Sequence, residues 1–366
     1  MSEWAIECLK PDLPSVETYT SLLAEMDSNQ WYTNFGPFVQ KFEAKMAQFL
    51  SSTDGAPLNV VSCNNATSAL ELMLQNSGLP KGAKVMVPSV TFPATILAVI
   101  RSEMEPVIAD VCEEEWTLTP AGVEAMLDYC DIDAVMPVAS FGYALDSRAW
   151  EAFIDRTGIP VFFDSAAALG QQEVSPKIPT VFSMHATKPF GIGEGGLIVT
   201  ASDAMASSSK LNSNFGFVQG LIKDIGFNAK LAEYFAIVGL TQFERWDAVT
   251  LKREQRWALY KECIDTLDTV DYCQAHKNKL PATLMVNTQG RSAAVIKTCI
   301  ENKIQTRQWY LPPLHKHEIF QSYIKVGLQG LDKCPVSEYL ESSLVGIPFH
   351  NFLTNEQIHH ICAIIK

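Results

Sequence analysis

The sequence predicts an α/β fold in which a mostly parallel central sheet is flanked by helices, with a smaller α+β domain at the C-terminal end. Apolar, strand-like runs recur through the first two thirds of the 366 residues, and helical patterning marks several of the segments between them. From about Ala229 onward the pattern becomes helical, and the remainder mixes short strands with helices. We therefore expect a large domain in residues 1–245 and a small domain in residues 246–366.

The elements of the large domain can be placed in chain order. Pro37 stands where a helix starts, and apolar residues follow at helical spacing as far as Phe49. Further helical patterns cover Thr67–Leu74 and Ala121–Tyr129. Alternation with strands indicates βα crossovers. The strands are expected at Leu58–Ser62, Lys84–Pro88, Pro106–Asp110, Asp133–Val138, Ile159–Asp164, Val181–Ser183 and Gly196–Thr200.

Composition excludes several classes of function. The formal net charge is −13 and the pI is near 5.0, which argues against nucleic acid or an anionic membrane as the main partner. The first thirteen residues lack the apolar core of a secretory signal, and no run of about 18 apolar residues occurs. The nine cysteines contain no C-x-x-C pair, so we expect reduced thiols in a cytoplasmic protein and no metal site.

Two residues indicate the chemistry. Lys188 lies in a short polar loop between two apolar runs, and Asp164 ends a strand where an α/β sheet presents its functional carboxyl edge. A lysine that can form a Schiff base and a carboxylate that can pair with a pyridinium nitrogen are what pyridoxal phosphate (PLP) requires of a protein. A helix N-cap would be the alternative role of Asp164. The first hypothesis is therefore a PLP enzyme.

Two other segments fit the same cofactor. Around Asn65, Ala66 and Thr67 a strand passes through a small polar turn into a helix, a junction that directs free N–H groups at an anion such as a phosphate. Phe92 follows another strand and could cover one face of a flat ring. Simple helix capping at the turn and a core position for Phe92 are the structural alternatives.

Taken in order, these motifs resemble the DegT/StrS family of nucleotide-sugar aminotransferases. The likeness is carried by Asn65-Ala-Thr67, Thr91-Phe92, Asp164, Ser183-x-His-x-Thr-Lys188 and Gly193-Glu-Gly-Gly196. It extends nearly end to end, from Asn34-Phe-Gly36-Pro37 through Gly226-Phe-Asn228 to Tyr310-Leu-Pro-Pro-Leu-His315 and Ile347-Pro-Phe-His350. The resemblance implies PLP fold type I, the architecture of aspartate aminotransferase.

The resemblance also implies roles for individual residues. Lys188 would be the Schiff-base lysine and Asp164 the partner of the ring nitrogen, with Phe92 stacked on the ring. Asn65, Ala66, Thr67 and Ser183 would surround the phosphate, together with Asn228 from the neighbouring subunit of a homodimer with shared sites. The donor would be L-glutamate and the acceptor a nucleotide-linked keto sugar, by analogy a 4-keto-6-deoxyhexose, aminated for surface polysaccharide or glycan synthesis. Its candidate contacts are Thr33, Asn34, His185, Arg307, Tyr310, His315 and His350, which could equally be structural residues of their domains.

Two positions depart from the family pattern and keep other functions open. Ala167 replaces a Gln or His that often contacts the ring hydroxyl, and Ala139 replaces a frequent His after the Pro-Val strand. Both changes would suit a non-catalytic PLP-binding regulatory or sensor protein. A PLP-dependent sugar dehydratase is the other alternative, but relatives with that activity carry His at the position of Lys188. Exposure to PLP and then glutamate separates a catalyst, whose spectrum changes, from a protein that only binds.

Overall fold

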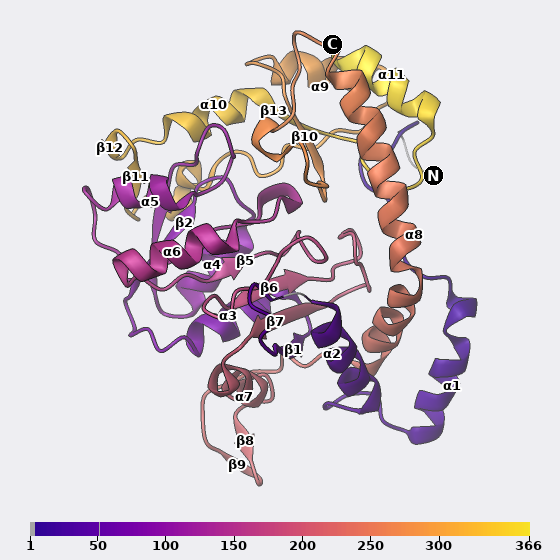
Figure 1. The fold of residues 1–366 in the computed structure, drawn as a ribbon, viewed down its shortest axis with the longest axis vertical. Helices are drawn as coiled ribbons and strands as arrows, with labels where there is room; N and C mark the ends of the chain where they lie inside the picture. The colour runs from indigo at the N-terminus through magenta and orange to yellow at the C-terminus, as the bar shows by residue number, and fades with distance from the viewer. Residues whose placement is uncertain (1–3, 51) are drawn as a thin grey trace.

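The computed structural model describes residues 4–50 and 52–366, and it is built around two neighbouring sheets that are linked edge to edge (Figure 1). One sheet has the strand order β12-β11-β3-β2-β4 and the other β1-β7-β6-β5. Parallel bridges from Val135 to Val161 and from Val138 to Asp164 join β4 to the β5 region. Their strands are β1 (Asn59–Cys63), β2 (Lys84–Pro88), β3 (Glu105–Ala109), β4 (Ala134–Val135), β5 (Phe163–Asp164), β6 (Thr180–Ser183), β7 (Gly196–Thr200), β11 (Lys325–Gly327) and β12 (Gly330–Leu331).

Strand direction brings the functional loops to one edge. β2 pairs in parallel with β3 and β4, and β5 pairs in parallel with β6. β7 runs antiparallel to both β1 and β6, with Gly196 opposite Cys63 and Ser183. The carboxyl ends of β1, β5 and β6 consequently lie close to the amino end of β7, and the loops that leave them meet.

Helices cover the sheets and form the rest of the molecule. Phe42 and Met46 of α2 pack with Ile237 of α8 in one buried cluster, while residues of α3 and α4 pack with the strands in another. The helices are α1 (Thr20–Asn29), α2 (Pro37–Phe49), α3 (Ala66–Gln75), α4 (Pro93–Arg101), α5 (Pro120–Met126), α6 (Ser147–Thr157), α7 (Asp203–Asn212), α8 (Glu233–Ile264), α9 (Ser292–Glu301), α10 (Pro335–Ser343) and α11 (Asn355–Ile365).

The long helix α8 connects the two ends of the molecule (Figure 1). Its first turn contains Glu233, whose buried carboxylate accepts the N–H groups of Phe38 and Val39 at 2.8 Å each and so caps α2. Its C-terminal half packs against α11 and the small sheet of β10 (Leu284–Asn287) and β13 (Leu344–Ile347). The boundary predicted at residue 245 falls inside this helix, and the division into two domains stays a prediction.

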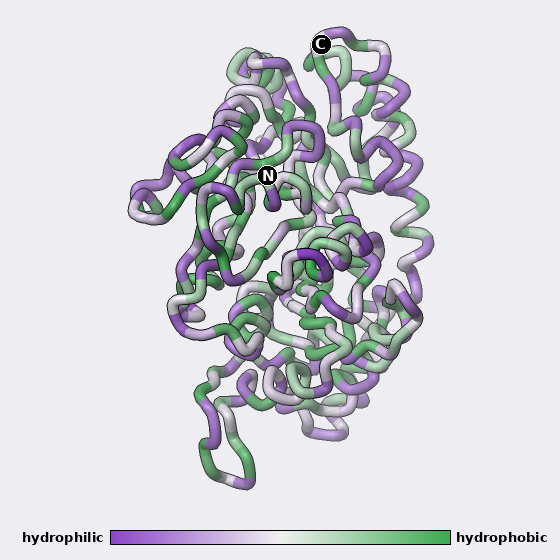
Figure 2. The backbone as a smooth tube through the Cα atoms, turned by 60° about the vertical axis from the view of Figure 1, so that its left-hand side comes forward, coloured by the Kyte–Doolittle hydropathy of each residue, from purple (hydrophilic) through white to green (hydrophobic). Residues whose placement is uncertain are grey.

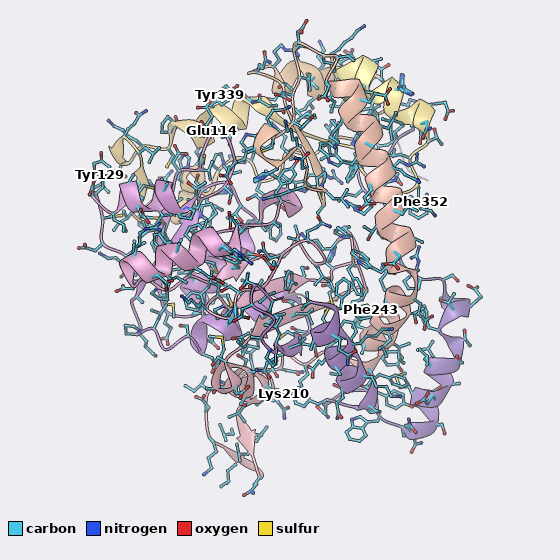
Figure 3. All side chains as sticks on the ribbon, viewed as in Figure 1. Glu114, Tyr129, Lys210, Phe243, Tyr339 and Phe352 are labelled. Carbon is cyan, nitrogen blue, oxygen red and sulfur yellow. The ribbon has the colours of Figure 1, made fainter. Side chains whose placement is uncertain are left out.

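A hairpin projects from the body in both views (Figures 1 and 2). It consists of β8 (Phe217–Val218) and β9 (Leu221–Ile222), and it follows the end of α7, where Lys210 is labelled in Figure 3. Its apolar side chains are exposed, with Ile222 at 68%. This hairpin was not predicted from the sequence.

The predicted α/β class is confirmed, and the seven predicted strands correspond to β1 to β7, shifted at their ends by a few residues at most. The run at Ile159–Asp164 forms ladder pairs only at Phe163 and Asp164. None of the helices in the described ranges is both long enough and apolar enough for a membrane crossing.

Candidate active site

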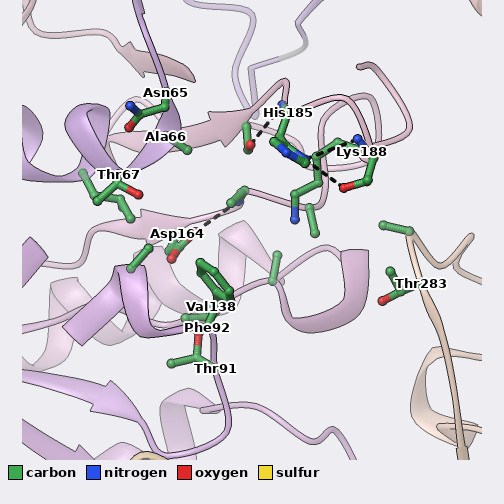
Figure 4. Close-up of a pocket in the computed structure, with 18 of the residues that line it drawn as sticks. Asn65, Ala66, Thr67, Thr91, Phe92, Val138, Asp164, His185, Lys188 and Thr283 are labelled. Carbon is green, nitrogen blue, oxygen red and sulfur yellow. Dashed lines mark hydrogen bonds between the residues drawn. The ribbon is translucent and has the colours of Figure 1, made fainter. Parts of the chain in front are cut away.

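A cavity of about 760 Å³ opens where the loops after β1, β5 and β6 meet. The N-terminal segment, α8 and the C-terminal region also contribute to its wall, through Leu9, Phe235 and Trp309. Nine of the predicted site residues line it: Asn65, Ala66, Thr67, Phe92, Asp164, Ser183, His185, Lys188 and Tyr310. Figure 4 shows side chains from distant parts of the chain converging on this space. The fold thus brings together most of the residues that the sequence analysis selected.

Asp164 is the buried acid of the cavity, with 4% of its surface exposed. Its Oδ2 accepts the Thr95 hydroxyl at 2.7 Å, and its Oδ1 accepts the Ala166 N–H at 3.1 Å. Burial raises the pKa of Asp164, while these two hydrogen bonds and the positive charge of Lys188 act in the opposite direction. A carboxylate in this position gains from a further cationic partner. No helix begins here, so the N-cap alternative for Asp164 is wrong.

Lys188 is the basic group that faces this acid. It is half-buried in the turn that follows β6, where its N–H donates to the His185 carbonyl at 2.8 Å. Burial lowers the pKa of Lys188, and attraction to Asp164 partly opposes that shift. A lowered pKa increases the fraction of neutral amine, the form that acts as a nucleophile or a base. Among the described residues that line the cavity, Lys188 is the single Lys or Arg.

The turn after β1 forms the third part of the site. Asn65 caps α3, because its side chain accepts the Ser68 N–H at 2.8 Å. The next two amides, those of Ala66 and Thr67, belong to the first turn and have no partner within the helix. Gly196 of β7 lies directly against this turn: a Cβ there would be 2.4 Å from the carbonyl carbon and oxygen of Asn65. A helix N-terminus held in this way is a suitable position for a phosphate.

An aromatic group covers one side of the cavity. Phe92 is 59% exposed, so the alternative that it is a core residue is wrong. Its ring meets the ring of Tyr310 edge to face, with centroids 5.9 Å apart, and Tyr310 in turn stacks on Phe141 at 5.5 Å. Figure 4 places Phe92 beside Asp164 and Val138. The exposed face of Phe92 is therefore available to a flat ligand.

His185 lies at the edge of the cavity with a defined orientation. Its Nδ1 accepts the Thr187 N–H at 3.3 Å and is 2.9 Å from the Thr187 hydroxyl. Its Nε2 is 3.7 Å from Glu194 Oε1, and both side chains are about half exposed. These contacts favour the tautomer that carries its proton on Nε2.

Six predicted residues do not line the cavity: Thr33, Asn34, Asn228, Arg307, His315 and His350. Thr33 and Asn34 are exposed before α2, and Arg307 pairs through its backbone with Gly346. The ring nitrogens of His350 contact the Glu7 carbonyl and the Phe352 N–H, both at 3.2 Å. His350 therefore holds the N-terminal segment in this chain.

Asn228 and His315 have other surroundings. Residue Asn228 is exposed, and its main-chain carbonyl accepts a hydrogen bond from Asn64 Nδ2 at 3.4 Å, beside the turn that precedes α3. His315 Nε2 is 3.7 Å from Glu338 Oε1. Their assigned roles as ligand contacts stay predictions.

Several cavity residues were not predicted as site residues: Leu9, Thr91, Glu194, Thr283 and Trp309. For Thr91 a signal did exist, since Thr91 and Thr95 are four residues apart at the start of a helix. Leu9 and Thr283 come from segments that have no local motif, and only the tertiary fold brings them here, whereas Trp309 directly precedes the Tyr310–His315 motif.

Comparisons with known proteins agree with this geometry. The model of the DegT/DnrJ/EryC1/StrS aminotransferase family matches residues 15–366. A dTDP-4-amino-4,6-dideoxy-D-glucose transaminase of Shigella dysenteriae is 27% identical over 372 residues, covering 98% of this chain and 97% of the relative.

Two further matches are similar. A UDP-N-acetyl-3-dehydro-alpha-D-glucosamine 3-aminotransferase of Acidithiobacillus ferrooxidans is 28% identical, with 84% of this chain and 83% of the relative covered. Among solved structures, a Bacillus cereus protein assigned to the PLP-dependent aminotransferases superposes with a TM-score of 0.89 at 26% identity, covering 98% of this chain and 99% of that one.

The close contact at Gly196 gives a testable prediction. Gly196→Ala should raise the dissociation constant for PLP by about tenfold or more, because the added methyl group must displace the turn at Asn65 and the N–H groups after it. Titration of the apo protein with PLP measures this. Gly122→Ala is the matched control, since its Cβ would meet only the Thr119 hydroxyl, at 3.1 Å. Unchanged PLP affinity in Gly196→Ala would show that the turn does not bind the phosphate.

Proposed function

Because this chain belongs to the DegT/DnrJ/EryC1/StrS aminotransferase family, whose cofactor is PLP, we propose that it transfers the amino group of L-glutamate to a nucleotide-linked keto sugar, a 4-keto-6-deoxyhexose. The observation that carries the proposal is the position of Lys188, Asp164 and the α3 N-terminus in the wall of one cavity. The product is an amino sugar for surface polysaccharide or glycan assembly, made in the cytoplasm. The relatives from Shigella and Acidithiobacillus, whose names describe amino transfer to nucleotide-linked sugars, support this substrate class.

The residues present fit PLP. Asp164 is a buried acid that gains from a cationic partner, and the pyridinium nitrogen is one. The exposed Phe92 ring offers a flat surface, and the free amides of Ala66 and Thr67 offer donors to the phosphate, beside the hydroxyl groups of Thr67 and Ser183. When bound, PLP supplies the electron sink that permits cleavage of a C–H bond next to the amino group.

The chain's own residues then divide the work. Lys188 would hold the cofactor through its Nζ, and as a free amine it would take the proton from the α-carbon of the donor. Its lowered pKa suits this task, because the amine must be neutral to accept a proton. Asp164 would place a negative charge beside the ring nitrogen, and Phe92 would cover one face of the ring. His185, whose Nε2 is 3.7 Å from Glu194 Oε1, would contact the polar part of the substrate.

The two alanines shape the acceptor site. Ala139 and Ala167 both line the cavity, and neither side chain can form a hydrogen bond. The retained Lys188 and Asp164 favour catalysis over a purely regulatory role. The space beside the alanines suits a sugar that carries a bulky or apolar substituent near the ring of the cofactor.

The active unit is a homodimer with shared sites. A PLP phosphate and a sugar diphosphate together bring several negative charges, yet the cavity wall of a single chain offers Lys188 and His185 against Asp164 and Glu194. Further donors from a second copy would remove this deficit. The exposed apolar hairpin of residues 217–222 lies near Asn228 in the sequence and is a suitable contact surface.

Borohydride reduction of the PLP-loaded protein should fix the cofactor on Lys188, since this amine faces Asp164 in the cavity. Peptide mapping by mass spectrometry identifies the labelled lysine. Lys188→Ala should not be labelled. Its transaminase activity should fall by about a thousandfold or more, the range expected when a general base is removed. Lys277→Ala, which changes an exposed lysine outside the cavity wall, should keep both the label and the activity. A label on another lysine, or an active Lys188→Ala variant, contradicts the assignment.

A substrate panel tests the reaction. dTDP-, UDP- and GDP-linked 4-keto-6-deoxyhexoses are offered with L-glutamate, and the amino sugar and 2-oxoglutarate are quantified. We expect turnover of at least one nucleotide sugar and release of one 2-oxoglutarate per amino sugar. The proposal is wrong if every sugar is refused while a simple 2-oxo acid is aminated efficiently.

Asn228→Ala should weaken PLP binding by about 1–3 kcal/mol, the loss expected for one hydrogen bond to a charged phosphate. Equilibrium titration measures the affinity, and sedimentation velocity shows whether the dimer persists. Asn278→Ala, an exposed asparagine elsewhere in the chain, is the control. Monomers that retain PLP and full activity on dilution to nanomolar concentrations are incompatible with shared sites.

A further inference from the structure

Two buried threonines form a chain of hydroxyl groups that ends on Asp164. Thr91 is 2% exposed and Thr95 is fully buried, and their Oγ1 atoms are 2.9 Å apart. Thr95 lies in the first turn of α4 and reaches Asp164 Oδ2 at 2.7 Å. Figure 4 shows Thr91 and Asp164 on the same side of the cavity as Phe92.

The direction of these hydrogen bonds follows from the number of protons. A threonine hydroxyl carries one proton, and an ionised carboxylate can only accept. When Asp164 is ionised, Thr95 donates to it, which leaves the Thr95 oxygen free to accept the proton of Thr91. A hydroxyl that itself accepts a hydrogen bond is a stronger donor, so Thr91 strengthens the bond from Thr95 to Asp164.

We infer that Thr95, supported by Thr91, is a positioning residue that keeps Asp164 ionised and aimed at the ring nitrogen of PLP. The inference rests on the proposed role of Asp164 and adds two residues that act through it. One oxygen of Asp164 is fixed by Thr95 and the other by the Ala166 N–H, so the carboxylate cannot rotate without breaking both bonds. The remaining lone pairs of the carboxylate are then available in one defined orientation.

The relay of hydrogen bonds from Thr91 to Thr95 to Asp164 offsets the effect of burial on Asp164. Burial favours the neutral acid, and in the described part of the chain the ionisable groups that face Asp164 are Lys188, from the loop after β6, and Tyr310, from the C-terminal region. With its Nζ bound to PLP, Lys188 would no longer offer the charge of a free ammonium group to Asp164. The hydrogen bonds from Thr95 and Ala166 then remain as protein contributions that favour the carboxylate.

The test uses the holoenzyme and the ¹⁵N NMR signal of PLP labelled at its ring nitrogen, which reports directly whether that nitrogen carries a proton. Thr95→Val keeps the shape of the side chain but removes the donor. We expect the ring nitrogen to lose its proton over the neutral pH range and the dissociation constant for PLP to rise about tenfold. Thr95→Ser should restore both properties, and Thr91→Val should shift them in the same direction by less.

Thr241→Val is the matched control, because Thr241 is also a buried helical threonine but donates to the Ile237 carbonyl in α8. It should leave the ¹⁵N signal unchanged. The relay is refuted if Thr95→Val keeps the wild-type ¹⁵N signal. This holds even if PLP affinity falls, because a loss of affinity with an unchanged signal indicates that Thr95 has only a packing role. Asp164→Asn separates the proposed role of Asp164 at the ring nitrogen from the proposed role of Thr95 in supporting it. If Asp164→Asn also leaves the nitrogen protonated, Asp164 is not its partner and both proposals fail; if it removes the proton while Thr95→Val does not, only the relay fails.

Discussion

The site depends on one buried carboxylate. Asp164 lies at the end of β5, bonded in parallel to Val138 on one side and to Val181 on the other, so its backbone is fixed by two neighbouring strands. With 4% of its surface exposed, it lacks the hydration that normally stabilises a carboxylate. Hydrogen bonds from Thr95 and Ala166 and the nearby amine of Lys188 stabilise the charged form of Asp164 instead. A cationic ring in the cavity would complete the arrangement, and its binding would then be coupled to the ionisation of Asp164.

The direction of β7 explains why the turn at Asn65–Thr67 and the loop that carries Lys188 meet. Since β7 is antiparallel to both β1 and β6, its first residue, Gly196, is opposite the last residues of both neighbours, Cys63 and Ser183. The glycine-rich loop before β7 therefore returns the chain from Lys188 to the start of α3. A side chain at Gly196 would overlap the backbone of Asn65, so the short distance between the two halves of the site requires glycine at this strand end.

Local sequence predicted those parts of the structure that have a local cause. The strands of the sheet are apolar runs, and Lys188 and Asp164 are polar residues at the ends of such runs, so the fold class and the centre of the site could be recognised. His350 could not be assigned in this way, because its two ring nitrogens contact Glu7 and Phe352, and the first of these contacts spans almost the whole chain. Leu9 and Thr283 likewise reach the cavity only through packing of the chain ends.

The N-terminal segment shows how such distant contacts shape the cavity. Asp12 accepts a hydrogen bond from Arg245 of α8 at 2.5 Å on one carboxylate oxygen and from Asn351 at 2.7 Å on the other. This single carboxylate therefore connects the long helix to the C-terminal region. Leu9, three residues earlier, is thereby held in the cavity wall. Because α8 also caps α2 through Glu233, its N-terminal half is anchored at two points to segments that precede it in the sequence. The C-terminal wall of the cavity is thus fixed relative to the sheet by polar contacts as well as by apolar packing, and a ligand between them meets a largely preformed site.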